Sequence, residues 1–155
     1  MKDLDPESQK WILLNQKRLE VKAVTIFRDM HVLGFHPILI KGWAAARNYP
    51  LGRPRCYSDI DLAVSSADFG HASRAMNLPG SRLAGVDLHD ELRHLDSAPW
   101  NDLFERSSLV EFENGSIRIL SAEDHLRVMA THWLNDGGAD KERLWDIYYA
   151  LANRR

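Results

Sequence analysis

Apolar residues recur at helical spacing from residue 7 to about residue 33, and this pattern predicts one long N-terminal helix. Trp11, Leu19 and Phe27 are among these positions, with charged residues between them. Gly34 is expected to end the helix, because glycine readily adopts the left-handed conformation found at helix C-termini. The short apolar run over residues 37–41 then predicts a buried strand.

The middle of the chain contains two stretches in which polar and apolar residues alternate, 59–64 and 83–90, and each predicts a half-buried strand. Ser65 is expected to cap a helix that runs from there to about residue 77. The alanine-rich stretch 43–49 is helix-prone. Residues 90–106 have no clear period and indicate a loop with some helix.

The last third of the chain begins with a hairpin pattern over residues 109–120, in which two apolar runs flank an Asn-Gly pair. A helix-start pattern follows at Ser121, and a last amphipathic helix is expected over residues 140–153. The order of these elements predicts an α/β or α+β fold. Such a fold would have a small mixed sheet flanked by helices, with further helices at the C-terminus.

Length and composition narrow the class of protein. The 155 residues fit a single domain, with an N-terminal helix (1–35), a sheet region (36–120) and C-terminal helices (121–155). The 20 basic and 22 acidic side chains give a formal net charge of −2, which argues against a nucleic-acid partner. Cys56 is the only cysteine, so a disulfide framework is excluded. No apolar run approaches a membrane span and the N-terminus is charged, so we expect a cytoplasmic protein with no membrane contact.

Three carboxylates are the strongest candidates for chemistry. Asp59 and Asp61 lie two residues apart on a predicted strand, so their side chains leave the same face. Adjacent like charges repel unless a cation lies between them, and oxygen ligands suit Mg²⁺ or Mn²⁺. The alternative is a pair of solvated acids on the wet face of the strand. If the strand that carries Asp87 is its neighbour, three carboxylates converge that could hold a divalent metal and take a proton from an attacking hydroxyl.

Other polar residues could assist these carboxylates. His89 shares a face with Asp87, and both a simple pairing with Asp87 and a catalytic role remain open. Lys41-Gly42 lies between a strand and a helix-prone segment, where a glycine lets a phosphate approach the backbone. Basic residues that are near the site in sequence could bind phosphate or could be solvated surface. They are Lys41, Arg47, Arg53 and Arg55.

The C-terminal helices carry histidines and aromatic residues for which we expect structural roles. His125 and His132 are seven residues apart on one helix face and are expected to pack rather than to bind zinc. Trp145 and Tyr148 are expected in the core or at a subunit contact. Because the last helix has many apolar groups for so short a chain, a homodimer is expected.

The segments Lys41-Gly42-Trp43 and Asp59-Ile60-Asp61-Leu62 resemble the signature of the polymerase-beta-like nucleotidyltransferase superfamily. Within it, Asp87-Leu88-His89 is similar to a strand of bacterial nucleotidyltransferase-family proteins, and the segments 118–126 and 143–147 are similar to that subgroup as well. The resemblance therefore covers most of the chain. Small antibiotic nucleotidyltransferases share this layout more distantly.

The sequence departs from the superfamily pattern in two places. Trp43 stands where the signature has a second small residue after the glycine, and 15 residues separate Trp43 from Asp59, slightly more than usual. The large Trp43 side chain makes a phosphate contact at the backbone of Gly42 less favourable. The loop with Pro50, Gly52 and Pro54 accommodates the extra length.

The resemblance implies a nucleotidyltransferase fold and the metal-dependent transfer of a nucleoside monophosphate from a nucleoside triphosphate (NTP) to an acceptor hydroxyl, with release of pyrophosphate. Asp59 and Asp61 would bind Mg²⁺ or Mn²⁺, and Asp87 would complete the metal site or act as the base. The implied nucleotide contacts are Lys41, Gly42 and Ser58, with Arg55 and His89 as further substrate or phosphate contacts. The sequence does not specify the acceptor. A non-catalytic regulatory or binding module on the same fold, such as an antitoxin-like partner, is the alternative.

Overall fold

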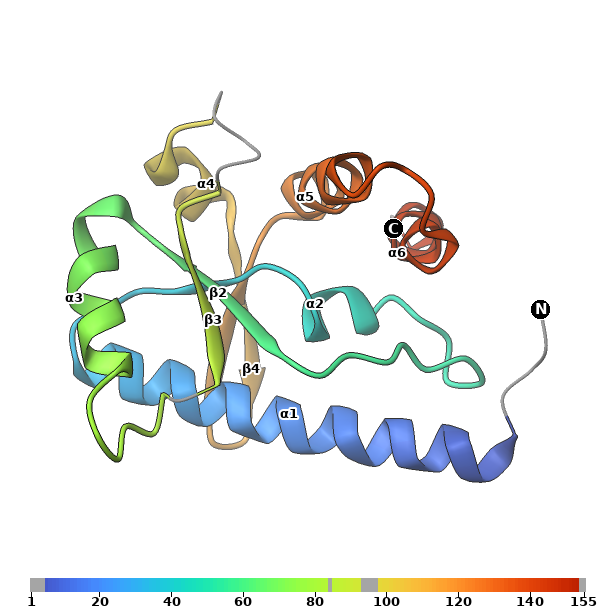
Figure 1. The fold of residues 1–155 in the computed structure, drawn as a ribbon, viewed down its shortest axis with the longest axis horizontal. Coiled ribbons are helices and arrows are strands. Elements are labelled where there is room, and N and C mark those ends of the chain that lie inside the picture. The colour runs from blue at the N-terminus through green and yellow to red at the C-terminus, as the bar shows by residue number, and fades with distance from the viewer. Residues whose placement is uncertain (1–4, 84, 93–97, 154–155) are drawn as a thin grey trace.

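The computed structural model describes residues 5–83, 85–92 and 98–153, which form a five-stranded mixed sheet and its surrounding helices (Figure 1). The strands are β1 (Ile38–Leu39), β2 (Ile60–Val64), β3 (Val86–Asp90), β4 (Ser108–Phe112) and β5 (Gly115–Ile119). The helices are α1 (Pro6–Val32), α2 (Trp43–Ala46), α3 (Ser66–Met76), α4 (Trp100–Arg106), α5 (Ala122–Asn135) and α6 (Lys141–Ala152). This architecture confirms the predicted fold class.

The strand order β3-β2-β1-β5-β4 mixes parallel and antiparallel pairs. β1 is antiparallel to β2 and parallel to β5, while β2 and β3 are parallel and β4 and β5 form an antiparallel hairpin. A helical connection through α3 joins β2 to β3, as parallel neighbours require. β2 and β3 therefore lie side by side, which is the condition on which the convergence of the three carboxylates depends.

Helices cover both faces of this sheet. α1 and α3 pack on one face, where Phe27 and Met30 meet Leu62 in a buried core (Figure 1). α4 and α5 pack on the other face, where Leu103 and Val128 enclose a second core. None of the helices in the described part of the chain is long and apolar enough to span a membrane.

Most predicted elements are present, with small differences at their ends. The helix-prone stretch 43–49 is α-helical only over Trp43–Ala46, and it then tightens into turns in which Asn48 N–H donates to the carbonyl of Ala45 and Tyr49 N–H donates to that of Ala46. The hairpin turn lies one residue earlier than the Asn-Gly pair suggests, because Phe112 pairs with Gly115. Some predicted positions lie outside the described residues: the two ends of the domain (1–4 and 154–155), one residue of the predicted strand 83–90 (84) and part of the predicted loop 90–106 (93–97).

The alternation of β2 determines which side chains meet the second core. Ile60, Leu62 and Val64 point toward α1 and α3, so Asp61 and Ala63 point toward α5. In the parallel register Asp61 pairs with Asp87, and Ala63 pairs with His89. The polar groups of both strands therefore share the face that α5 partly covers.

Candidate active site

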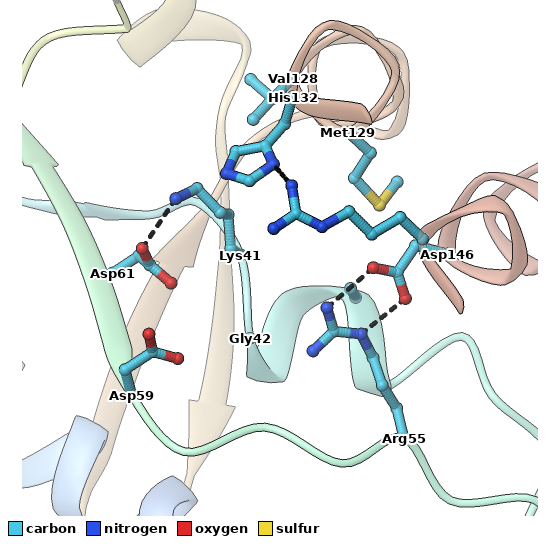
Figure 2. Close-up of a pocket in the computed structure, with 11 residues that line it drawn as sticks. Lys41, Gly42, Arg55, Asp59, Asp61, Val128, Met129, His132 and Asp146 are labelled. Atoms are coloured by element: carbon cyan, nitrogen blue, oxygen red, sulfur yellow. Dashed lines mark hydrogen bonds and ion pairs between the residues drawn. The ribbon is translucent and has the colours of Figure 1, made fainter. Parts of the chain in front are cut away.

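A pocket opens between the sheet and the C-terminal helices (Figure 2). Lys41 and Gly42 line it from the loop after β1, and Asp59 and Asp61 line it from the start of the neighbouring strand β2 and the residue before it. α5 and α6 form its cover, with polar side chains directed inward (Figure 2). Three segments that are distant in sequence thus contribute to one pocket.

Asp61 is the buried carboxylate of this site. Lys41 Nζ lies 2.9 Å from its Oδ1, and His89 Nε2 lies 3.3 Å from the same atom. Burial opposes ionisation of Asp61, but the hydrogen bonds from His89 and Lys41 outweigh it and hold the pKa below its ordinary value. Asp61 is therefore a negatively charged group at neutral pH, although only 4% of the residue is exposed.

Asp59 lies immediately before β2 and is exposed. Its carboxylate faces the same pocket as that of Asp61 (Figure 2). The two acids therefore share a wall, as their spacing predicts, but they differ in environment. Asp61 is held by two neighbouring side chains, whereas Asp59 borders open solvent.

A second group of polar atoms forms around Asp61 on the side of β3. His89 Nε2 lies 3.3 Å from Asp61 Oδ1 and 3.3 Å from Asp87 Oδ2. One ligand atom from each of these three residues lies within 4.8 Å of the others, so the group could hold a metal ion. Asp59 is not part of this group. Asp61 is the residue that links the pocket to the cluster of Asp61, Asp87 and His89.

Gly42 brings the loop after β1 against the backbone that carries Asp59. It has a φ of +52°, and an added Cβ would lie 3.2 Å from the carbonyl oxygen of Asp59 and 3.3 Å from the Tyr57 ring. A side chain would be strained in this conformation and crowded by both neighbours. Glycine is therefore required here by the packing of the chain as well as by any approach of a phosphate.

Trp43, the large residue after the glycine, points away from the pocket. Its indole N–H donates to Glu20 Oε2 at 2.9 Å, and its ring packs 5.5 Å from that of Phe112. The departure from the superfamily pattern therefore leaves the pocket open, because Trp43 packs against α1 and β4. Ser58 is exposed and does not line the pocket.

Arg55 lines the pocket but is already paired. Its Nε and Nη2 donate to the two carboxylate oxygens of Asp146 at 2.5 and 2.8 Å, and the Tyr49 hydroxyl donates to Asp146 at 2.7 Å. Burial, with the nearby Asp146 carboxylate, raises the pKa of Tyr49 well above its usual range. This network joins the loop before β2 to α6, and Arg53 adds a contact 3.8 Å from the ring centroid of Trp145.

The C-terminal helices supply three polar lining residues for which the sequence predicted no place in a site: His132, Arg143 and Asp146. His125 is buried, as expected for packing, but His132 faces the pocket and its Nδ1 contacts Arg143 (Figure 2). Arg143 also forms an ion pair with Asp136. Arg143 and Asp146 are three residues apart in an amphipathic helix, and this polar face was the available signal for a functional role.

A family model described as uncharacterised nucleotidyltransferase matches residues 6–155. No curated protein and no solved structure matches the chain. The family match includes the sheet and the C-terminal helices, and therefore both walls of the pocket.

Proposed function

The chain belongs to this family of uncharacterised nucleotidyltransferases, and from that premise we propose that it is an enzyme that transfers a nucleoside monophosphate from an NTP to an acceptor hydroxyl. The observation that carries the proposal is the pocket in which Asp59 and Asp61 face Lys41 and Gly42. Carboxylates and a phosphate-accessible backbone then lie side by side in one cavity. This is an arrangement suited to a metal-bound triphosphate.

The donor groups fit a divalent metal. Carboxylate oxygens are preferred by Mg²⁺ and Mn²⁺, and the ligand atoms of Asp61, Asp87 and His89 already lie within 4.8 Å of one another. We assign the carboxylates of Asp59 and Asp61 as metal ligands, and that of Asp87 either completes the metal site or acts as the base. When bound, the ion would neutralise charge that develops on the pyrophosphate leaving group.

The remaining lining residues would bind and orient the nucleotide. Gly42 leaves its backbone open to the pocket, and the Lys41 ammonium lies beside Asp61 where it can also reach a phosphate oxygen. His132 and Arg143 offer donors from the opposite wall. Ser58 lies outside the lining of the pocket, so its role as a phosphate contact stays a prediction from the sequence. We assign Arg55 to the positioning of α6, because Asp146 engages two of its nitrogens.

Asp87 has two candidate roles, base and metal ligand. Its side chain is 61% exposed, compared with 6% for Asp61, so an acceptor hydroxyl can approach it. A carboxylate at that position can accept the proton that the acceptor loses. If Asp87 is chiefly the base, Asp87→Asn should abolish transfer and retain nucleotide binding. If it is chiefly a ligand, the variant should weaken nucleotide binding as well.

The test measures transfer from the four labelled NTPs to a panel of hydroxyl compounds, together with Mg²⁺-dependent NTP binding. Asp59→Asn and Asp61→Asn should lower transfer by about 10²–10³-fold or more, because charge on the leaving group would be less well neutralised. Glu111→Gln is a matched control, since Glu111 is an exposed carboxylate on β4, the strand at the other edge of the sheet from β3. Circular dichroism confirms that each variant is folded.

If the double variant Asp59→Asn, Asp61→Asn transferred nucleotide at the rate of the wild type, the proposed mechanism would be contradicted. NTP binding without transfer to any acceptor would favour the regulatory or binding module. Thermal unfolding gives a second measurement. Mg²⁺ and an NTP together should raise the melting temperature more than either alone, because the triphosphate completes the metal shell.

A further inference from the structure

The cluster of Asp61, Asp87 and His89 contains a nitrogen donor in addition to its two carboxylates. We propose that His89 is a direct ligand of the divalent cation, and that this mixed oxygen–nitrogen site selects Mn²⁺ over Mg²⁺. The inference rests on the proposed function for the presence of a cation at the site. It adds the identity of one ligand and the class of metal that the site takes.

The first argument is the position of the imidazole nitrogen. His89 Nε2 lies 3.3 Å from Asp61 Oδ1 and 3.3 Å from Asp87 Oδ2. Metal–ligand distances of about 2.0–2.2 Å place neighbouring ligand atoms about 2.8–3.6 Å apart in octahedral and tetrahedral shells. Both separations fall in this range, so the nitrogen has the spacing of a ligand that shares an ion with each carboxylate.

The second argument is that hydrogen bonding alone accounts poorly for the same geometry. A ring nitrogen carries at most one hydrogen, so Nε2 cannot donate a well-directed hydrogen bond to two carboxylates on different strands. Charge-assisted N–H···O bonds are typically about 2.7–2.9 Å long, and both separations exceed this range. Lys41 Nζ, at 2.9 Å from Asp61, has the distance expected for such a bond.

The third argument is the rigidity of the support. Asp61 pairs with Asp87 and Ala63 pairs with His89 in the parallel ladder of β2 and β3, so the register of two strands sets the spacing. Ala63 is fully buried, and Leu88 packs against the core on the other face. Three ligands on two paired strands are already close together, and metal binding requires little reorganisation of the backbone.

The ligand set decides the metal. Mg²⁺ favours an all-oxygen shell and retains water, whereas imidazole suits transition metals. A nitrogen ligand should therefore raise the affinity for Mn²⁺ relative to Mg²⁺. Replacing His89 with Gln should remove this preference, and His89→Asp should shift it toward Mg²⁺ because a carboxylate would then replace the nitrogen ligand.

The decisive measurement is pulsed electron paramagnetic resonance of the folded protein with Mn²⁺ and inorganic tripolyphosphate. Tripolyphosphate completes the metal shell without adding nitrogen atoms of its own. We expect modulation from one directly bound ¹⁴N in the wild type and its loss in His89→Gln. His71→Gln is the matched control, because His71 is an exposed histidine on α3 and should leave the modulation unchanged.

Affinities measured by titration give the second readout. His89→Gln should lower Mn²⁺ affinity by about 10–100-fold and Mg²⁺ affinity much less, so the ratio of the two should fall. An equal loss for both ions would overturn the proposal, since it would indicate that His89 only positions Asp61 and Asp87. Bound Mn²⁺ without ¹⁴N modulation, or no Mn²⁺ binding, would also overturn it.

These outcomes are separate from those of the proposed function. A protein with Mg²⁺-dependent transfer but no ¹⁴N modulation retains the function and loses this inference. A protein whose bound Mn²⁺ shows the modulation, but which neither binds nor transfers any NTP, retains the ligand assignment and loses the function.

Discussion

The buried His125 should make the stability of the protein depend on pH. The residue is 7% exposed, and its Nε2 has no hydrogen-bond partner among the described residues. Burial lowers the pKa of His125 from 6.5 to about 4; the nearby Asp146 opposes this shift, while Arg55 and Arg47 add to it. The folded protein therefore keeps this imidazole neutral at pH values where an unfolded chain protonates it.

The sign and size of the effect follow from proton linkage. Between pH 6.5 and pH 4 the unfolded chain binds a proton that the folded chain does not, so unfolding becomes more favourable as the pH falls. One pKa unit corresponds to about 1.4 kcal/mol, so the full shift is worth about 3 kcal/mol. At pH 5 the stability should be about 2 kcal/mol lower than at pH 8 from this residue alone.

The assay is urea denaturation of the wild type and of His125→Asn at pH 8 and pH 5. Asn does not titrate, and its side-chain amide can replace the imidazole in the hydrogen bond with the backbone of Ile40. Any constant packing cost of the substitution cancels when each protein is compared with itself. We expect the pH-dependent loss to be about 2 kcal/mol smaller in the variant. His71→Asn, which removes an exposed imidazole, should retain the wild-type loss. Equal losses in the wild type and His125→Asn would refute the reasoning.

Three further predictions concern the supports of the pocket and the assembly of the protein. Gly42→Ala should destabilise the fold by about 1–3 kcal/mol and weaken NTP binding. Gly34→Ala should destabilise it less, because both glycines have positive φ but only Gly42 has close neighbours. Chemical denaturation and NTP titration test both effects. Asp146→Asn should cost about 3 kcal/mol of stability by leaving Arg55 without its partner, and Arg55→Gln in the same chain should recover part of the loss in denaturation experiments. The exposed apolar face of α6 should form a homodimer contact, so light scattering should give twice the monomer mass. Tyr148→Glu should lower the measured mass toward that of the monomer. A monomer mass for the wild type at high concentration would exclude the dimer.

Local sequence patterns predict most helices and strands of this fold, because burial of one face sets the spacing of apolar residues within each element. β2 alternates so that Leu62 enters the core while Asp61 faces the pocket, and this alternation is visible in the sequence. Strand pairing is different. β1 has only two paired residues, yet it lies between β2 and β5 at the centre of the sheet. No local pattern specifies such partners, because they depend on how distant segments pack.

The same distinction applies to the site. The spacing of Asp59 and Asp61 predicts a common face, and their shared pocket agrees with it. The contribution of His132 and Arg143 depends on the docking of α5 and α6 above the sheet, which is held in part by Arg55 and its buried partner on α6. A periodicity argument assigns each helix an apolar stripe but does not say which neighbour its polar face will meet.

β3 forms an edge of the described sheet, and that position gives its charges a second consequence. An edge strand presents unpaired backbone groups on which other chains can assemble into intermolecular sheets. Asp87 and Asp90 place charge on both faces of this strand and disfavour such pairing by repulsion. Asp87, which we propose as a site residue, therefore also acts with Asp90 as a gatekeeper against aggregation. Neutralising them should lower the yield of soluble protein during refolding, even where the native fold is unchanged.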